Sequence, residues 1–217
     1  MVFFGDMAIG TADNVSGRTY EVSLYDPIEK EYLKHDLLSF VWTGQTLIDR
    51  SSKGMTVMFE VLYKRSSRFA YTGSELIHGW TEEMLIKTYD EQGQYQRAFY
   101  YPDPGIPLEV EDALAQYQNP GENVVRAIRN DTLPETWPAF DVLQPDDEGR
   151  LWISTFTSDP QTSEWWILDA TDGTLLARFD WPREKKVEQI KNDKLYARET
   201  EKETGLQEIV RYGIEIF

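Results

Sequence analysis

The feature that most constrains this fold is a run of four short β segments, separated by turns, between residues 133 and 182. Two of the turns, at residues 146–149 and 169–173, combine aspartate with glycine. Aspartate tolerates the turn and glycine supplies positive φ, expected here at Gly173, so each cluster can reverse the chain between paired strands. The pattern predicts a four-stranded antiparallel meander, with strands at residues 140–143, 151–156, 165–168 and 175–181.

A second meander with the same features comes earlier in the chain, with strands expected at residues 69–71, 75–80, 84–89 and 95–101. Residues 86–93 correspond to residues 166–173, and both blocks end in an aromatic residue followed by proline, at Tyr101 and Trp181. The same turn and the same strand ending, found twice, indicate an internal repeat. Each meander of about 42 residues has the size of a β-propeller blade.

Outside the meanders, further alternating or apolar segments predict strands at residues 2–9, 20–25, 37–42 and 55–63, and at 187–190, 195–198 and 209–217. We expect residues 55–63 to form the longest strand and residues 45–54 to form a loop. A different interpretation is open for residues 183–204, because Val187 and Ile190 also fall on helical spacing, which fits one solvated helix.

Residues 107–131, between the two meanders, predict a helical insert. Val110, Ala113, Leu114 and Tyr117 share one helical face, and an Asn-Pro-Gly sequence stops the helix. A second short turn of helix is expected around Ile128.

The predicted fold class is all-β, a single β-propeller-like domain over residues 1–217 with one short helical insert. Segments such as 165–168 are apolar on both faces, which requires a sheet that is covered on both sides, and blades cover one another without helices. The blades are expected at residues 1–54 (partial), 55–102, 133–182 and 183–217 (partial). Closed propellers have about 4–8 blades, so about 3–4 blades predict an incomplete ring that self-associates as a homodimer.

Three motifs resemble those of a known family: L-P-x-x-x-P-A-F from Leu133, D-x-E-G-R-L-W-I from Asp146, and D-x-x-D-G-T-L-L from Asp169. They are similar to the C-terminal blades of the six-bladed β-propeller, NHL-like proteins of bacteria, over residues 68–217. The resemblance implies export to the periplasm or cell surface, without an assigned activity. The N-terminus has no basic region and carries Asp6 in its apolar run, so we expect a strand there rather than a signal peptide.

Charge and composition exclude several classes of function. A formal charge of −16 repels nucleic acid and anionic lipid, so no nucleic-acid partner is expected. The apolar runs fall far short of the roughly 20 residues that span a bilayer, so no membrane span is expected. The chain has no cysteine, which excludes disulfides and thiolate chemistry.

The sequence offers weak candidates for a ligand site. Arg150 and Trp152 share one face at a strand start: either the arginine covers the tryptophan, or both line a pocket at the end of the ring. His78 is a further candidate. The only other histidine, His35, lies in a different predicted element, so we expect no metal site and no cofactor.

Two more motifs have a structural and a functional interpretation. Residues 146–148 are expected to be a turn, since they lack the D-x-D-x-D-G spacing of a calcium loop. Trp165 and Trp166 fit packing between blades better than a sugar platform, because adjacent strand residues point to opposite faces.

These observations favour a non-enzymatic binding or scaffold protein whose partner, a protein or a small ligand, the sequence does not identify. The alternative is a metal-dependent propeller enzyme of the lactonase or lyase type, which holds its metal with carboxylates, asparagine and histidine. The scarcity of histidine favours the first hypothesis.

Overall fold

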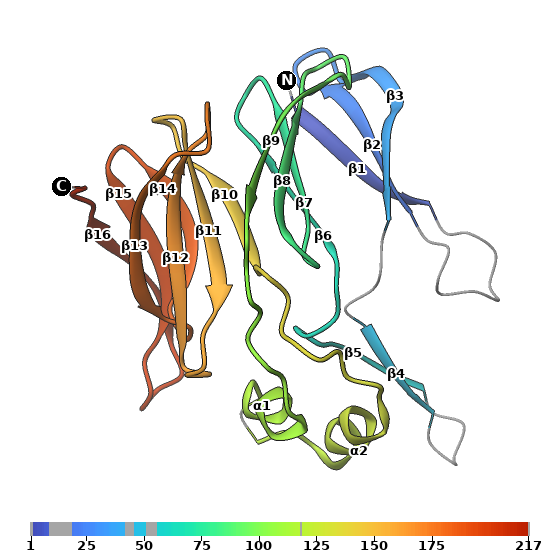
Figure 1. Ribbon diagram of the computed structural model, residues 1–217, viewed down its shortest axis with the longest axis vertical. Coiled ribbons are helices and arrows are strands. Elements are labelled where there is room, and N and C mark those ends of the chain that lie inside the picture. Colours follow the sequence, from blue (N-terminus) through green and yellow to red (C-terminus); the bar gives the residue numbers. More distant parts are fainter. Residues whose placement is uncertain (1, 9–18, 42–45, 51–55, 118, 217) are drawn as a thin grey trace.

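The computed structural model describes residues 2–8, 19–41, 46–50, 56–117 and 119–216. Within them the chain is mostly β: antiparallel sheets stand next to one another in an open row that does not close into a ring (Figure 1). Two short helices lie together at one end of the row. The predicted fold class, with blade-like sheets and an incomplete ring, is confirmed.

The central sheet is the meander predicted between residues 133 and 182. Its strands pair in chain order: β10 (Val142–Pro145), β11 (Arg150–Phe156), β12 (Thr162–Asp169) and β13 (Leu175–Pro182). Gly149 and Gly173 have φ angles of +78° and +80° in the two turns that join β10 to β11 and β12 to β13. These values confirm that the glycines allow the chain to reverse there.

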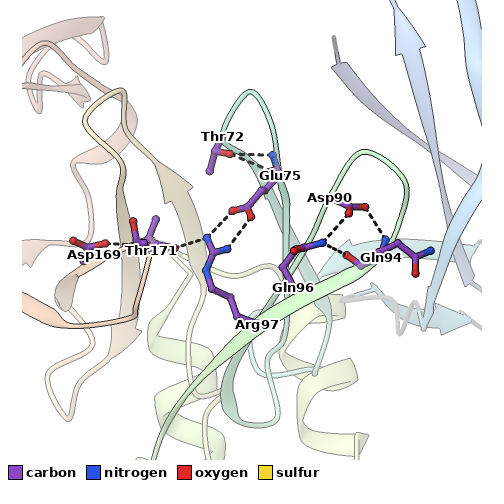
Figure 2. A network of polar contacts seen from close by, with 9 residues as sticks. Thr72, Glu75, Asp90, Gln94, Gln96, Arg97, Asp169 and Thr171 are labelled. Carbon is purple, nitrogen blue, oxygen red and sulfur yellow. Dashed lines mark hydrogen bonds and ion pairs between the residues drawn. The ribbon is translucent and has the colours of Figure 1, made fainter.

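The preceding sheet is the other complete meander. It consists of β6 (Ser67–Tyr71), β7 (Leu76–Trp80), β8 (Met84–Tyr89) and β9 (Tyr95–Tyr101). Arg97 of β9 donates hydrogen bonds of 2.8 and 2.6 Å to the two carboxylate oxygens of Glu75, and a third of 2.8 Å to the Ala170 carbonyl. Figure 2 shows this guanidinium between the β6–β7 turn and the turn that carries Asp169 and Thr171. One side chain thus links two blades.

The C-terminal sheet has three strands in the described part of the chain: β14 (Lys186–Lys191), β15 (Lys194–Thr200) and β16 (Gln207–Gly213). Asn192 and Asp193 have φ angles of 52° and 54° in the tight turn between β14 and β15. The solvated helix considered for residues 183–204 is therefore wrong. A turn at the Asn-Asp pair interrupts the helical spacing, and β15 then alternates buried and half-buried residues.

The N-terminal sheet orders β1 (Val2–Ala8), β2 (Thr19–Asp26) and β3 (Glu31–Val41). The strand predicted at 37–42 begins earlier, at Glu31, because Asp26 accepts hydrogen bonds from the Ile28 and Glu29 amides and shapes a hairpin turn. The first six residues of β3 are exposed, so no apolar alternation marked them as strand.

A two-stranded sheet pairs β4 (Thr46–Arg50) with β5 (Thr56–Glu60). Two predictions are wrong here: residues 45–54 include a strand, and β5 is short, whereas β3 is the longest strand at 11 residues. The apolar run that predicted a strand to residue 63 leaves the sheet after Glu60. Val61 and Tyr63 are instead buried against the helical insert.

The helical insert contains α1 (Val110–Ala115) and α2 (Glu122–Asn130). Glu109 begins α1 with a capping box to Asp112. The insert is confirmed, and its second helix is longer than the single turn that we expected. Neither of these helices is long and apolar enough to cross a membrane.

Two cores hold the central sheet between its neighbours. One contains Ile86 and Phe99 of the preceding sheet with Trp166 of the central sheet. The other contains Trp152 of the central sheet with Leu195 of the C-terminal sheet. Blades therefore cover blades, as the continuous apolar strands predicted.

Candidate functional site

A stack of three side chains lies at the end of the central sheet that faces the helical insert. The rings of Trp137 and Phe156 are parallel within 13°, with centroids 4.6 Å apart. The guanidinium carbon of Arg183 lies 4.6 Å from the centroid of the same Phe156 ring. We call Trp137, Phe156 and Arg183 the Phe156 stack.

Local hydrogen bonds hold the stack in place. Asp159 shapes the β11–β12 loop by accepting from the Gln161 amide at 3.0 Å and from the Thr162 hydroxyl at 2.8 Å. The Arg183 amide donates to the Gln161 carbonyl at 2.8 Å, and the Trp137 amide donates to the Ile106 carbonyl at 2.8 Å. The backbone of the loop therefore positions Arg183, and Ile106, directly before the insert, positions Trp137.

Phe156 and Arg183 of this stack line three cavities between them. The first, of about 250 Å³, separates the stack from the insert and is lined by Phe156, Arg183 and Gln116, the C-terminal cap of α1. A second, of about 310 Å³, also has Arg183 in its wall. A third, of about 240 Å³, has Phe156 in its wall. The stack thus contributes to the walls of all three cavities, which together we call the hollowed region.

The 310 Å³ cavity, which we call the Arg183 cavity, lies between the central and C-terminal sheets. Its wall combines apolar and hydroxyl-bearing residues with cations and two acidic residues. These include Val142, Ser154, Ser163, Trp165, Arg183, Lys185, Lys186, Arg198, Asp141 and Glu188. Small pockets of this size, with a few convergent polar groups, are typical of ligand sites.

Arg183 is the least satisfied of the half-buried cations in that wall. Its Nη2 donates one long hydrogen bond, 3.5 Å, to the Thr162 carbonyl. Its Nε is buried and has no hydrogen-bond partner among the described residues. Burial lowers the pKa of the Arg183 guanidinium, and the charge of Asp141 opposes that effect. Even so, an arginine remains protonated in a protein.

Apart from the exposed Lys186, the other charges around the Arg183 cavity are already paired. Arg68 binds Asp141 at 2.9 Å, and Arg198 binds Glu188 at 2.7 Å. Lys185 binds a carboxylate outside the cavity, Glu199, at 3.0 Å. The positive charge of Arg183 therefore remains uncompensated by an ion pair in the described part of the chain.

The structure places Arg150 and Trp152 at the opposite, turn-bearing end of the central sheet. Both donate to one carboxylate oxygen of Asp146, from Arg150 Nε at 2.5 Å and from Trp152 Nε1 at 2.8 Å. Arg150 also pairs with Glu148 at 2.9 Å. Residues 146–149 form the predicted turn, in which Asp146 accepts from the Glu148 amide at 2.9 Å. The ring of Trp152 reaches an aromatic-walled cavity of about 410 Å³ between β13 and β16.

His78 lies in a different place again, between the preceding and N-terminal sheets. Its ring packs on Phe40, with centroids 4.0 Å apart, and its Nε2 lies 3.0 Å from the Ser67 hydroxyl. Because Ser67 donates its own proton to the Val41 carbonyl, the neutral histidine donates from Nε2. Burial, followed by the charge of Lys87, lowers the pKa of His78 to about 4.

The three predicted site residues are therefore not brought together: His78 is on another sheet from Arg150 and Trp152. His35 is exposed on β3. No group of three or more histidine, aspartate or glutamate side chains suited to a metal ion occurs in the described ranges.

Sequence reasoning missed the Phe156 stack, although one signal was available. The two repeats end in Tyr101-Pro102 and Trp181-Pro182, and the next residue is Asp103 in one and Arg183 in the other. A change from an acid to an arginine at equivalent positions marks Arg183 as specific to its blade.

No protein-family model and no curated protein sequence matches this chain. Among solved structures, it is similar to the β-propeller domain of the Trilobed protease from Pyrococcus furiosus, with a TM-score of 0.35 and 10% identity over 97% of this chain and 58% of that one. It is also similar to the acylaminoacyl peptidase of Pyrococcus horikoshii, with a TM-score of 0.38 and 10% identity over 97% of this chain and 33% of that one.

A third similar structure is a candidate 6-phosphogluconolactonase from Bacteroides uniformis, with a TM-score of 0.28 and 10% identity over 93% of this chain and 80% of that one. The chain spans only 58% and 33% of the lengths of the two Pyrococcus proteins. These likenesses concern the fold, and none of them places the chain in a family.

Proposed function

We propose that this protein is a non-enzymatic, β-propeller-like binding protein whose ligand site is the hollowed region around the Phe156 stack. The observation that carries the proposal is the sharing of walls: Phe156 and Arg183, two residues of one stack, line three cavities between them. Aromatic surfaces with a few fixed polar groups are what small-ligand sites use for affinity and orientation.

Preorganisation supports the same proposal. Trp137 and Phe156 are buried, and backbone hydrogen bonds hold the segments on both sides of them. A ligand that enters therefore does not have to order the wall first, which removes one cost of binding. An exposed, adaptable loop surface would lack this advantage.

The test is a ligand-observed NMR screen of small aromatic fragments with the wild-type chain and two variants. Ser158 is exposed and lines the 250 Å³ cavity, so Ser158→Trp should obstruct its mouth. Ser74 is exposed in the β6–β7 turn, so Ser74→Trp adds the same side chain at a distant site. We expect fragments that bind the wild type and Ser74→Trp but lose binding to Ser158→Trp.

Binding that is unaffected both by Ser158→Trp and by Arg183→Gln would place the site outside the 250 and 310 Å³ cavities and overturn the proposal. Metal analysis of the purified protein covers the enzymatic alternative. Stoichiometric calcium or zinc, together with hydrolysis of a lactone by the metal-loaded protein, would favour a metal-dependent hydrolase instead.

A further inference from the structure

The geometry of the Arg183 cavity points to a carboxylate as the group that this site recognises, an inference that rests on the proposed function. We propose that the guanidinium of Arg183 binds the carboxylate of an organic ligand whose apolar body lies against Trp165 and Val142. The carboxylate can belong to a small organic acid or to a peptide, since the recognising chemistry is the same.

The first argument is the unused hydrogen-bonding capacity of Arg183. A guanidinium has five N–H donors in a planar fork. In the described structure its side chain donates one 3.5 Å hydrogen bond to the Thr162 carbonyl, while the buried Nε has no partner. A buried donor without a partner is unfavourable. An acceptor that enters the cavity can form the hydrogen bond that no group of the protein forms with Nε, and this stabilises the complex.

The second argument is the sign of the local charge. The whole chain carries a formal charge of −16. The wall of this cavity has the opposite sign, because it contains four cations and two acidic residues. Lys185 and Arg198 are neutralised by Glu199 and Glu188, and Lys186 is exposed to water, whereas the half-buried Arg183 forms no ion pair with a described residue. An anion is therefore attracted to Arg183 first.

The third argument concerns shape, and it selects a carboxylate with an apolar body. The planar fork of arginine matches the two oxygens of a carboxylate, which it binds through paired hydrogen bonds. Ser154 and Ser163 are buried and line the same cavity, where hydroxyl groups can also donate to an anion. The remaining wall includes Trp165 and Val142, which favour an aromatic or aliphatic body.

The experiment uses benzoate as the probe and benzamide as its uncharged analogue, with calorimetric titration at pH 7.5 and low ionic strength. We expect the full chain to bind benzoate at least tenfold more tightly than benzamide. Arg183→Gln should weaken benzoate binding at least tenfold. Lys191→Gln, which removes the same charge from an exposed lysine outside the cavity, should change it less than threefold.

The benzoate–benzamide comparison needs no variant, so it decides the matter even if Arg183→Gln folds poorly. Equal affinity for the two probes, or no binding of benzoate at 10-fold the concentration at which neutral fragments bind, would overturn the inference. If neutral fragments bind the wild type and this binding is lost in Ser158→Trp, the proposed function would stand even though the carboxylate inference had failed. Acetyl-phenylalanine and its amide, titrated in the same way, show whether a peptide carboxylate is accepted as well as a free acid.

Discussion

Trp165 and Trp166 are consecutive residues of β12, yet their indole rings lie in two different cores. Trp165 is 3% exposed in the core shared with the C-terminal sheet, and Trp166 is 8% exposed in the core shared with the preceding sheet. Adjacent side chains of a strand point to opposite faces, so one dipeptide covers both sides of the central blade. The tandem tryptophans are packing residues, as the sequence predicted, and not a sugar platform.

Truncation of the inter-blade tryptophans should destabilise the protein strongly. We expect Trp152→Ala and Trp166→Ala each to lower the free energy of unfolding by about 3–5 kcal/mol, because each removes a buried aromatic side chain from a core. Leu176→Ala in β13 is the control, since Leu176 is 40% exposed and should cost little. Urea unfolding followed by circular dichroism measures all three, and equal midpoints for Trp166→Ala and Leu176→Ala would contradict the packing.

Gly173→Val should be more harmful than Gly149→Val. Both glycines have positive φ, which valine resists, so each change should cost about 1 kcal/mol or more. A side chain at Gly173 would in addition collide with the ring of Phe99, whereas Gly149 has open space around it. The difference between the two urea midpoints isolates the steric part, and identical midpoints would rule out the contact with Phe99.

A hydroxyl without a partner predicts a stabilising substitution. Thr88 of β8 is fully buried, and its Oγ1 has no hydrogen-bond partner among the described residues. Thr88→Val should therefore raise the free energy of unfolding by about 1 kcal/mol, since it replaces an unsatisfied polar group with a methyl group of similar size.

Thr81→Val is the matched control for that substitution. Thr81 is equally buried, but its Oγ1 accepts a hydrogen bond of 2.9 Å from the Ser66 amide. The same chemical change should here destabilise the protein by about 1–3 kcal/mol. Thermal unfolding in parallel should move the two midpoints in opposite directions, and a loss of stability in both would show that the Thr88 hydroxyl does have a partner.

Stability should depend on pH through His78. Its pKa is lowered to about 4 in the folded state, so the unfolded chain binds the proton more readily between pH 6.5 and 4. Stability is therefore complete above about pH 6.5 and falls as the pH decreases towards 4, by about 2–3 kcal/mol.

His78→Gln should remove most of that slope, and His35→Gln should leave it unchanged because His35 is exposed. Urea unfolding at half-unit pH steps measures the slope for each chain. If the His78→Gln variant loses stability between pH 6.5 and 4 as steeply as the wild type, other groups control this range.

The predicted homodimer can be tested at β16. This strand pairs only with β15 in the described structure, and its Ile209 is 59% exposed, whereas the third strands of the two complete blades are covered by a fourth. Bare edge strands favour pairing with a second copy. Ile209→Lys should shift the chain to monomer in light scattering, and Ile28→Lys, in the β2–β3 turn, should not. A wild-type monomer of 25.3 kDa at micromolar concentration would refute the dimer.

The blades were predictable because their signals are local. Aspartate and glycine at the turn ending in Gly173, with aromatic strands on either side, determine a hairpin without reference to the rest of the chain. The start of β3 at Glu31 was not predictable, since its first residues are exposed and no apolar pattern forms. β4 was missed in the same way, because it lies in a segment that shows no alternation in the sequence.

Beyond the change from Asp103 to Arg183 between the repeats, the candidate site could not be predicted, because it depends on distant parts of the chain. Trp137 comes from the segment after the insert, Phe156 ends β11, and Arg183 follows β13. No motif links these three positions, and only the packing of the insert against the central sheet brings them into one stack. The sequence did suggest Arg150 and Trp152. Both donate hydrogen bonds to Asp146 and so stabilise a turn.

The continuity of each sheet in sequence has a consequence for how the chain folds. The preceding, central and C-terminal sheets each pair strands that follow directly along the chain. Strand pairing within these sheets therefore needs no segment that is distant in sequence. Short loop closures are fast, and units of this kind can form in the order in which synthesis releases them. The slow event should then be docking, when the faces that carry Trp152 and Trp166 first meet their neighbours. An emerging chain would therefore expose the aromatic face of each completed blade until the neighbouring blade has formed.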